Sequence, residues 1–552
     1  MKKLFFAIPL LGILAGCNSY LDMTPRDSIS DKVMWASTES AEYAVNSIYS
    51  YSYDIFAAWP STVGMTEAFT DEFKYGSYVN FAYCLIPSQV AYGGTNLTNS
   101  FVSVYLGCWG ELYNAIRRTN EAISNLHNLG KDLPEADQKR LEGELRLMRG
   151  WLYFELVKRY KDVIIYDEDL TQIAVDKALS TEAEGWEFIW NDLSAAAEAL
   201  PVKAEAKGRL DKGVAYALIT RAMLYAGEYQ KVIDAADALE ELGYSLNPSY
   251  AEAFTKTVQE GNPETILQYG FSYADGVTHE FDFYYTPGGD YKLAQQQGGG
   301  YGTPTQEMVE SYEFASGGFP DWSPWHSSTT ANPPYAQLEP RFQATVLYNG
   351  AAWKGRKIEP YVGGTDGFCQ WNKEPQPQGR TTTGYYLRKG VDETHDLNQR
   401  SQSIQHFVLL RYGEVLLNKA EACYRNSDPD GANAAVEAIR KRVGLPYTKK
   451  SGDALWQAIR QERRVELAFE GLWYWDLRRW GDAVEDWPVG LNNYQVHGLK
   501  IEPTAVDGQF LYTYVSVDDK DRNFPEKMLR RFPIPDGELN SNSLVNQYPE
   551  WN

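Results

Sequence analysis

The sequence predicts a mainly α-helical protein in which a tetratricopeptide-like repeat scaffold carries a large irregular insertion with short strands. Three observations support this fold class. Apolar residues recur at helical spacing in several long blocks, and two adjacent helix pairs are joined by tight turns. Between residues 244 and 400 the helical pattern stops, and Gly, Pro, Asn, Gln and Thr become frequent.

The N-terminal helices are predicted from apolar residues spaced three and four apart, which line one face of a helix. Pro134 suits the first turn of its helix, where the missing N–H has no partner to lose. Trp109 falls on the inward face of its helix, so we expect it in the core. The predicted helices span residues 38–53, 102–129, 134–160, 182–200 and 211–227.

The repeat character comes from two helix pairs. In residues 210–242, one helix ends at Gly227 and the next begins at once with Glu228 and Tyr229. Small residues and a tight glycine connection are what an antiparallel helix pair requires. Residues 407–425 and 431–443 form a similar pair, although a strict repeat period is not visible. We therefore expect one body, with the helical scaffold in residues of about 30–243 and 401–552.

The insertion, residues of about 244–400, contains only short pieces with strand character, at 265–269, 345–348 and 385–387. A second aromatic and polar loop covers residues of about 56–100. Irregular stretches of this length in a compact protein are usually functional. We expect both on one side of the scaffold, carrying the ligand site.

Composition narrows the class of ligand. The 74 Asp and Glu residues outnumber the 52 Lys and Arg residues, which gives a net charge of −22. This charge repels phosphate backbones and anionic lipids, so nucleic-acid binding through charge is excluded. The 39 Tyr and 16 Trp residues exceed what a core needs. These rings combine an apolar face with a polar edge, so they suit hydroxylated ligands.

The first residues resemble a bacterial lipoprotein signal. Lys2 and Lys3 precede an apolar stretch at 4–15, which is shorter than the ~20 residues of a membrane span. The sequence Leu14-Ala15-Gly16-Cys17 then resembles a lipobox, in which cleavage precedes an acylated cysteine. We expect residues 1–16 to be the signal peptide and Cys17 to carry the lipid. An ordinary secretory signal followed by a chance cysteine is the alternative.

No enzyme or metal motif stands out. The six histidines are isolated, the cysteines show no CxxC spacing, and neither a GxSxG elbow nor a phosphate-binding glycine loop is present. We therefore expect no catalysis and no cofactor. One spacing resembles a calcium loop, with Asp428, Asp430 and Glu437 as candidate ligands. The favoured interpretation is a turn that caps the following helix.

A charged motif near the C-terminus has a spacing that indicates a structural role. In residues 459–471, IRQERRVELAFEG, the carboxylates Glu462, Glu466 and Glu470 recur at helical spacing with arginines between them. Such pairs support a helix and attach it to its neighbours. We therefore interpret the motif as structural and not as a ligand site.

The same motif, with YWDLRRWG at 474–481, resembles the signature of the SusD/RagB family. Residues 407–422, 147–160, 531–535 and 544–551 resemble further family segments, so the resemblance spans nearly the whole chain. Leu472 and Trp473 depart from the family's frequent His-Arg after the Glu-Gly. The resemblance implies a lipid-anchored protein of the bacterial outer membrane, exposed at the cell surface. Its partner would be a SusC-like TonB-dependent transporter.

The resemblance also implies a non-catalytic protein that captures oligosaccharides or polysaccharides and delivers them to that transporter. A RagB-like protein that captures peptides is the main alternative, and a structural lid for the transporter is a third. The family's starch-binding members use an aromatic platform on loops. The matching candidates here are Tyr75, Tyr78 and Asn80 from the first loop, and Tyr284, Tyr285, Tyr291, Trp322 and Trp325 from the insertion.

Overall fold

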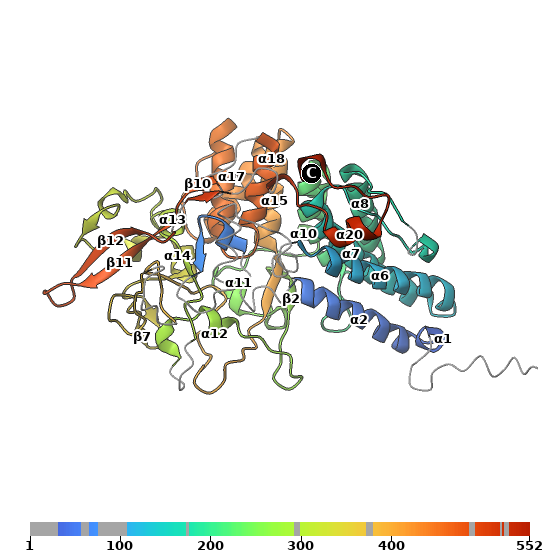
Figure 1. The fold of residues 1–552 in the computed structure, drawn as a ribbon, viewed down its shortest axis with the longest axis horizontal. Coiled ribbons are helices and arrows are strands. Elements are labelled where there is room, and N and C mark those ends of the chain that lie inside the picture. Colours follow the sequence, from blue (N-terminus) through green and yellow to red (C-terminus); the bar gives the residue numbers. More distant parts are fainter. Residues whose placement is uncertain are drawn as a thin grey trace, which may run out of the picture.

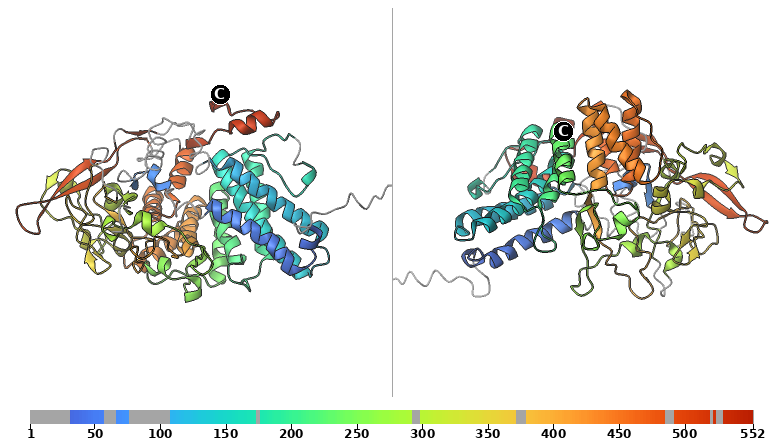
Figure 2. Two further views of the ribbon diagram at one scale, coloured as in Figure 1. Left: turned by 60° about the horizontal axis from the view of Figure 1, so that its bottom comes forward. Right: turned by 180° about the vertical axis from the view of Figure 1, so that it is seen from behind.

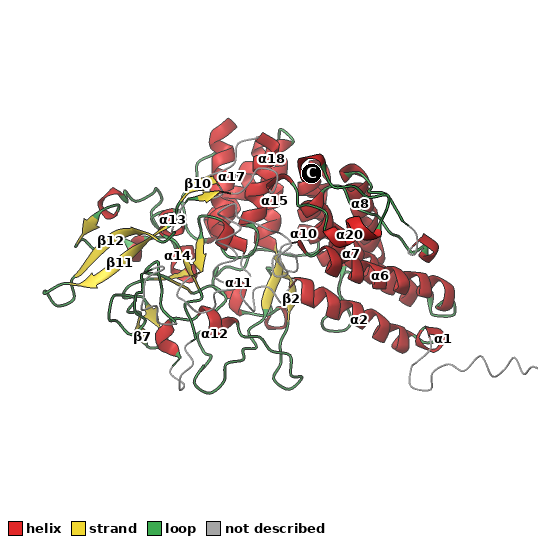
Figure 3. Ribbon diagram, in the orientation of Figure 1, coloured by secondary structure: helices red, strands yellow, loops and turns green. Residues whose placement is uncertain are grey.

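The structure, a computed structural model, confirms a mainly helical protein with tetratricopeptide-like helix pairs (Figure 1). Packed helices form one part, and a loop-rich body with short strands lies beside it (Figure 3). The residues described are 31–56, 66–75, 107–172, 176–291, 298–370, 379–484, 492–518, 521–523 and 529–551.

The N-terminal helices form antiparallel neighbours. Local sequence sets their ends: Thr181 makes a capping box with Glu184, and the Asp211 side chain accepts from the Val214 N–H. Gly227 closes its helix at φ 76°, a left-handed conformation that glycine adopts readily. The helices are α1 (Asp31–Met34), α2 (Thr38–Phe56), α6 (Trp109–Leu129), α7 (Glu135–Tyr160), α8 (Glu182–Ala199), α9 (Lys212–Ala226) and α10 (Tyr229–Glu241).

The C-terminal helices continue the same scaffold, because α15 packs against α9 and α10 (Figure 2). A short helix near the C-terminus lies over the N-terminal helices (Figure 1). The helices are α15 (Tyr412–Arg425), α16 (Pro429–Arg442), α17 (Gly452–Glu466), α18 (Trp473–Val484) and α20 (Asp536–Ser541). Among the described residues, no helix combines the length and apolar character that crossing a membrane requires.

The predicted helix at 407–425 begins too early. Residues Phe407–Arg411 form strand β9, which pairs antiparallel with β2 (Thr265–Tyr269), and the helix starts at Tyr412. The Phe-Val-Leu-Leu run suits a strand, and its partner lies about 140 residues earlier in the chain. Long-range pairing therefore overrides the helical pattern at this point.

The calcium-like loop is a helix cap. Asp428 accepts a hydrogen bond from the Gly431 N–H at 2.9 Å and starts α16. Asp430 pairs with Lys449 at the surface, and Glu437 lies exposed on α16. Among the described residues, no cluster of three or more His, Cys, Asp or Glu side chains is arranged to hold a metal ion.

The loop-rich body contains short elements joined by long connections. The predicted strands at 345–348 and 385–387 appear as β5 (Val346–Leu347) and β8 (Tyr386–Leu387), which pair with each other. The other strands before β9 are β1 (Phe73–Tyr75), β3 (Gly302–Pro304), β4 (Ser328–Thr329), β6 (Ala352–Trp353) and β7 (Arg356–Lys357). Its short helices are α11 (Glu252–Thr255), α12 (Phe281–Tyr285), α13 (Gln306–Glu310) and α14 (Pro340–Thr345).

Residues after α18 also join this body, although sequence analysis assigned 401–552 to the helical scaffold. Strands β11 (His497–Pro503) and β12 (Phe510–Ser516) form a hairpin, and β12 also pairs with β4. The hairpin extends at the end of the molecule opposite the N-terminal helices (Figure 1). Strands β10 (Asn492–Tyr494) and β13 (Arg522–Asn523) make a further pair.

Two main cores hold the fold. One lies between the helices and includes Trp109, which confirms its predicted place in the core. The other fills the loop-rich body around Trp353, Tyr385 and Tyr386. The burial of so many aromatic rings within long loops explains part of the high Tyr and Trp content.

The charged motif joins the two parts, which confirms its structural interpretation. Glu466 is fully buried and contacts three arginines, while Glu462 is buried and Glu470 is partly buried beside it. The arginine and lysine partners come from α14, β9, α16 and the segment after β8: Arg341, Arg411, Arg440, Arg442 and Lys389. The motif therefore ties the scaffold to the loop-rich body.

Candidate functional site

Two predicted site residues meet in the core beside α12. Tyr75 on β1 and Tyr285 on α12 bring their hydroxyl oxygens within 3.1 Å, and their exposed fractions are 2% and 0%. Strand β1 pairs with β3, where Gly302 leaves room for the ring of Phe73. A ring buried in this way has no face to offer a ligand. Tyr75 and Tyr285 therefore lie in the core, which contradicts the prediction that they form an exposed platform.

Tyr284 and Tyr291 lie near them with little free ring surface. Tyr284 is half-buried, packs edge-on against Tyr301 at 4.7 Å and donates to Glu280. Tyr291 is 8% exposed and packs against Phe283, so it also belongs to the core. These predicted residues therefore lie near one another and pack against rings of the protein.

Three predicted residues lie outside the described part of the chain. Tyr78 and Asn80 follow β1 in the sequence, and Cys17 belongs to the N-terminal segment. Their assignments therefore stay predictions.

The two predicted tryptophans lie elsewhere, at the short 3-10 helix η7 (Ser323–Trp325). Trp322 is 5% exposed and packs beside Tyr335, so its assignment to a platform is also wrong. Trp325 is only half-buried, and its Nε1 donates to the Ala331 carbonyl at 3.0 Å. Trp325 packs on the cluster formed by β11 and β12, together with Tyr514. It therefore keeps ring surface at the edge of this sheet.

Beside Trp325, one histidine ring stacks on a tyrosine ring, and a second histidine ring packs against the same tyrosine at a tilt of 40°. His497 on β11 lies 4.4 Å from Tyr514 on β12 at an interplanar angle of 15°, and His326 lies 4.8 Å from the same tyrosine ring. The His326 side chain is 45% exposed. We call these four residues, Trp325, His326, His497 and Tyr514, the outer aromatic surface. Each of the four side chains is at least partly exposed to solvent.

Two carboxylates of α13 hold the stack. Glu310 Oε1 lies 2.8 Å from His326 Nε2, and Glu307 Oε1 lies 2.6 Å from His497 Nδ1. Burial, and then the nearby Glu307 and Glu310 charges, raise the pKa of Tyr514, so its hydroxyl stays protonated at neutral pH. The surface therefore offers rings for packing and carboxylate, imidazole and phenol groups for hydrogen bonds.

This chemistry suits a hydroxylated ring. A sugar presents C–H groups on one face, which pack on aromatic rings, and hydroxyls at its rim, which bond to carboxylates and imidazoles. Sequence analysis missed His326, His497 and Tyr514 in this role. The sequence contained one signal for Tyr514: aromatic residues alternate at Phe510, Tyr512 and Tyr514. Alternate residues share one face of a sheet, so this pattern predicts an aromatic face.

Two family profiles match the chain. Residues 263–551 match the profile described as SusD family, and residues 20–224 match the one described as starch-binding associating with outer membrane. A "SusD-like protein" from Bacteroides ovatus is 23% identical, covering 99% of this chain and 97% of that protein.

Solved structures share the fold. A SusD-like protein from Bacteroides fragilis is 26% identical with a TM-score of 0.77, covering 96% of this chain and 100% of that one. A structure described as a laminarin-binding SusD-like protein is 22% identical with a TM-score of 0.64, covering 93% of this chain and 99% of that one. The SusD family profile alone spans more than half of the chain, from β2 to the C-terminal residues, and on that ground the chain belongs to the SusD family.

Proposed function

We propose that the protein is a non-catalytic glycan-binding lipoprotein of the outer membrane that delivers oligosaccharides to a TonB-dependent transporter. The observation that carries the binding role is the outer aromatic surface, where stacked rings lie beside two carboxylates. Starch-binding and laminarin-binding descriptions of similar proteins support a glycan as the ligand. Transport partner and membrane location follow from the family resemblance.

Glycan binding is tested with the full chain in detergent, first on a glycan array and then by calorimetry. Stacking on one ring is worth roughly 1–3 kcal/mol for nucleic-acid bases, and we take a similar scale for a sugar. Trp325→Ala and His326→Ala should therefore weaken binding of the array's best glycan about tenfold or more. Tyr43→Ala is the matched control, because Tyr43 is 63% exposed on α2, in the helical part.

Two results would contradict this assignment. Unchanged glycan affinity in both variants would show that the glycan does not bind at the outer aromatic surface. Binding of peptides with no binding of any arrayed glycan would favour the peptide-capturing alternative.

Lipid attachment is tested separately. Cys17→Ser removes the only thiol that the lipobox-like sequence presents for acylation. Metabolic labelling with a fatty acid should mark the wild-type chain and leave the variant unlabelled, with the variant released from the membrane fraction. Label retained by the variant would show that Cys17 is not the acylated residue.

A further inference from the structure

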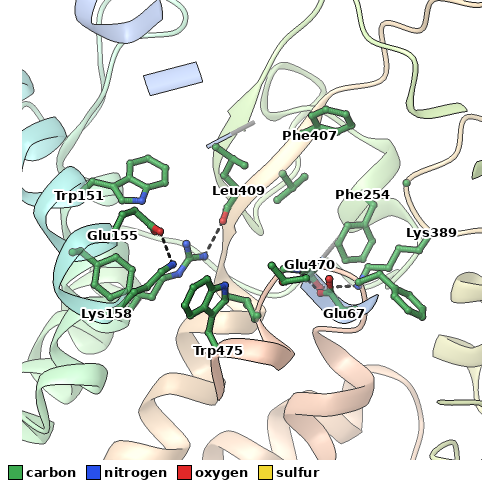
Figure 4. Close-up of a pocket in the computed structure, with 18 of the residues that line it drawn as sticks. Glu67, Trp151, Glu155, Lys158, Phe254, Lys389, Phe407, Leu409, Glu470 and Trp475 are labelled. Carbon is green, nitrogen blue, oxygen red and sulfur yellow. Dashed lines mark hydrogen bonds and ion pairs between the residues drawn. The ribbon is translucent and has the colours of Figure 1, made fainter. Parts of the chain in front are cut away.

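A partly open cavity of about 230 Å³ lies away from the outer aromatic surface. It is formed where the helical scaffold meets the loop-rich body, between α7, α9, β9 and the 3-10 helix η2 (Thr66–Phe69) (Figure 4). One water needs about 10–15 Å³, so the space is at least about fifteen times that of a single water. A small molecule therefore fits.

Lys158 lies on one side of the cavity (Figure 4). Its Nζ pairs with Glu155 Oε2 at 2.6 Å, and the same carboxylate oxygen also accepts from Arg159. Within the described residues, Glu155 is the hydrogen-bonding partner of Lys158, and an ammonium group has three N–H donors. Lys158 can therefore donate a further hydrogen bond to a negatively charged oxygen of a ligand.

Aromatic rings flank this lysine, and its burial disfavours the charged form. Its Nζ lies 4.5 Å from the centre of the Trp475 ring and 5.0 Å from that of Phe154. Burial lowers the pKa of Lys158 to about 7, although Glu155 acts in the opposite direction. A second carboxylate at this position would stabilise the protonated amine.

Thr66 and Glu67 line the cavity too, and Figure 4 shows Glu67 on the side away from Lys158. Glu67 is fully buried; its Oε1 accepts from the Gly471 N–H. Within the part of the chain that the structure describes, Glu67 Oε2 and Thr66 Oγ1 have no hydrogen-bond partner. Buried polar groups normally have one, so these two oxygens have hydrogen-bonding capacity that the described residues do not use.

The walls between the two polar sides are aromatic. Phe254, Phe407 and Trp475 line the cavity, and most of its surface is apolar. Burial raises the pKa of Glu67, and the hydrogen bond from the Gly471 N–H acts in the opposite direction. Lys158 and its partner Glu155 therefore lie at one side of the cavity. Glu67 lies at the other side beside the ion pair of Lys389 and Glu470 (Figure 4), and apolar walls lie between the two sides.

We propose that this cavity binds a small hydroxylated carboxylate, the size of one sugar acid, with its carboxylate at Lys158 and its hydroxyls at Thr66 and Glu67. The proposal is independent of glycan binding at the outer aromatic surface. A neutral sugar would leave Lys158 without a second negative partner, and a simple hydrocarbon acid would leave Thr66 and Glu67 without theirs.

The test uses the full chain in detergent at about pH 6, below the pKa of about 7 at Lys158. Glucuronate and galacturonate are titrated by calorimetry, with glucose and glutamate as comparison ligands. We expect at least one of the two sugar acids to bind and to raise the melting temperature, because a ligand that binds only the folded state stabilises it. Glucose and glutamate should bind at least tenfold more weakly.

The variants locate the site. Lys158→Met keeps the packing against Trp475 and should weaken sugar-acid binding about tenfold to a hundredfold, while Thr66→Val should weaken it about twofold to tenfold. Lys139→Met is the matched control on the same helix, because Lys139 is 65% exposed and pairs only at the surface with Glu135. Trp325→Ala should also leave this binding unchanged.

Several results would overturn the proposal. Absence of sugar-acid binding to the wild-type chain would do so whether or not the variants fold. Equal binding of glucose would remove the role of Lys158, and tighter binding of glutamate would assign the cavity to amino acids. Loss of sugar-acid binding in Trp325→Ala, with none in Lys158→Met, would move the ligand to the outer aromatic surface.

Discussion

Replacing Glu466 with Gln is expected to lower the free energy of unfolding by about 3–5 kcal/mol near pH 7, because it leaves buried arginines short of a counter-charge. The Glu466 side chain is fully buried and contacts Arg341, Arg411 and Arg442. Glutamine keeps the volume, removes the charge and replaces one accepting oxygen with an NH2 group that cannot accept from the arginines. Denaturation by urea, followed by circular dichroism, measures the change.

The same variant should alter the dependence of stability on pH. Burial alone would raise the pKa of Glu466, but the guanidinium groups of Arg442, Arg411 and Arg341 outweigh it and hold the pKa well below its usual range. Such a carboxylate contributes stability above its unfolded pKa of about 4.3, and this contribution is lost as the pH falls toward the folded pKa. The stability gap between wild type and Glu466→Gln should therefore narrow on acidification.

Glu252→Ala is the control, because Glu252 and Lys256 form an exposed pair on the surface. Exposed pairs are worth about 0–1 kcal/mol, so this variant should unfold almost as the wild type does. A Glu466→Gln variant as stable as the control would show that the buried network tolerates the loss, which contradicts its role in joining scaffold and loop-rich body.

Trp322→Ala is expected to lower the free energy of unfolding by about 3–5 kcal/mol, the scale of removing a large aromatic residue from a core. Trp322 is 5% exposed and packs against Trp325 and Tyr335. Its Nε1 has no hydrogen-bond partner among the described residues, so packing carries the effect. The same urea titration measures it.

Trp325→Ala is the informative comparison. Because the Trp325 ring is only half-buried, its removal should lower the free energy of unfolding by less, about 1–2 kcal/mol. The same variant should bind glycan more weakly. A Trp322→Ala variant that melts like wild type and fails to bind glycan would restore Trp322 as a ligand-contacting ring and contradict its assignment to the core.

Several features of this protein could be predicted from local sequence. Gly227 requires a left-handed conformation, Asp211 and Thr181 cap helices, and Asp428 starts α16, because each depends on contacts within a few residues. The spacing of Glu462, Glu466 and Glu470 also indicated a structural motif, because these carboxylates recur at helical spacing with arginines between them. The family could also be recognised from contiguous segments of the chain.

Only the tertiary structure decided which aromatic rings are exposed. Trp322 and Trp325 have nearly the same sequence context, yet one lies in the core and the other at the edge of a sheet. That difference depends on strand β12, against whose cluster Trp325 packs. Strand β12 pairs with β4, which lies about 180 residues earlier in the chain. Strand β9 likewise replaced a predicted helix start because β2 pairs with it. Local sequence determined the helix ends, because their contacts are near in the chain. The arginines that pair with the charged motif come from distant segments, so the tertiary structure decided its partners. Ring exposure and strand pairing depend on residues brought together from distant segments, so only the tertiary structure could decide them.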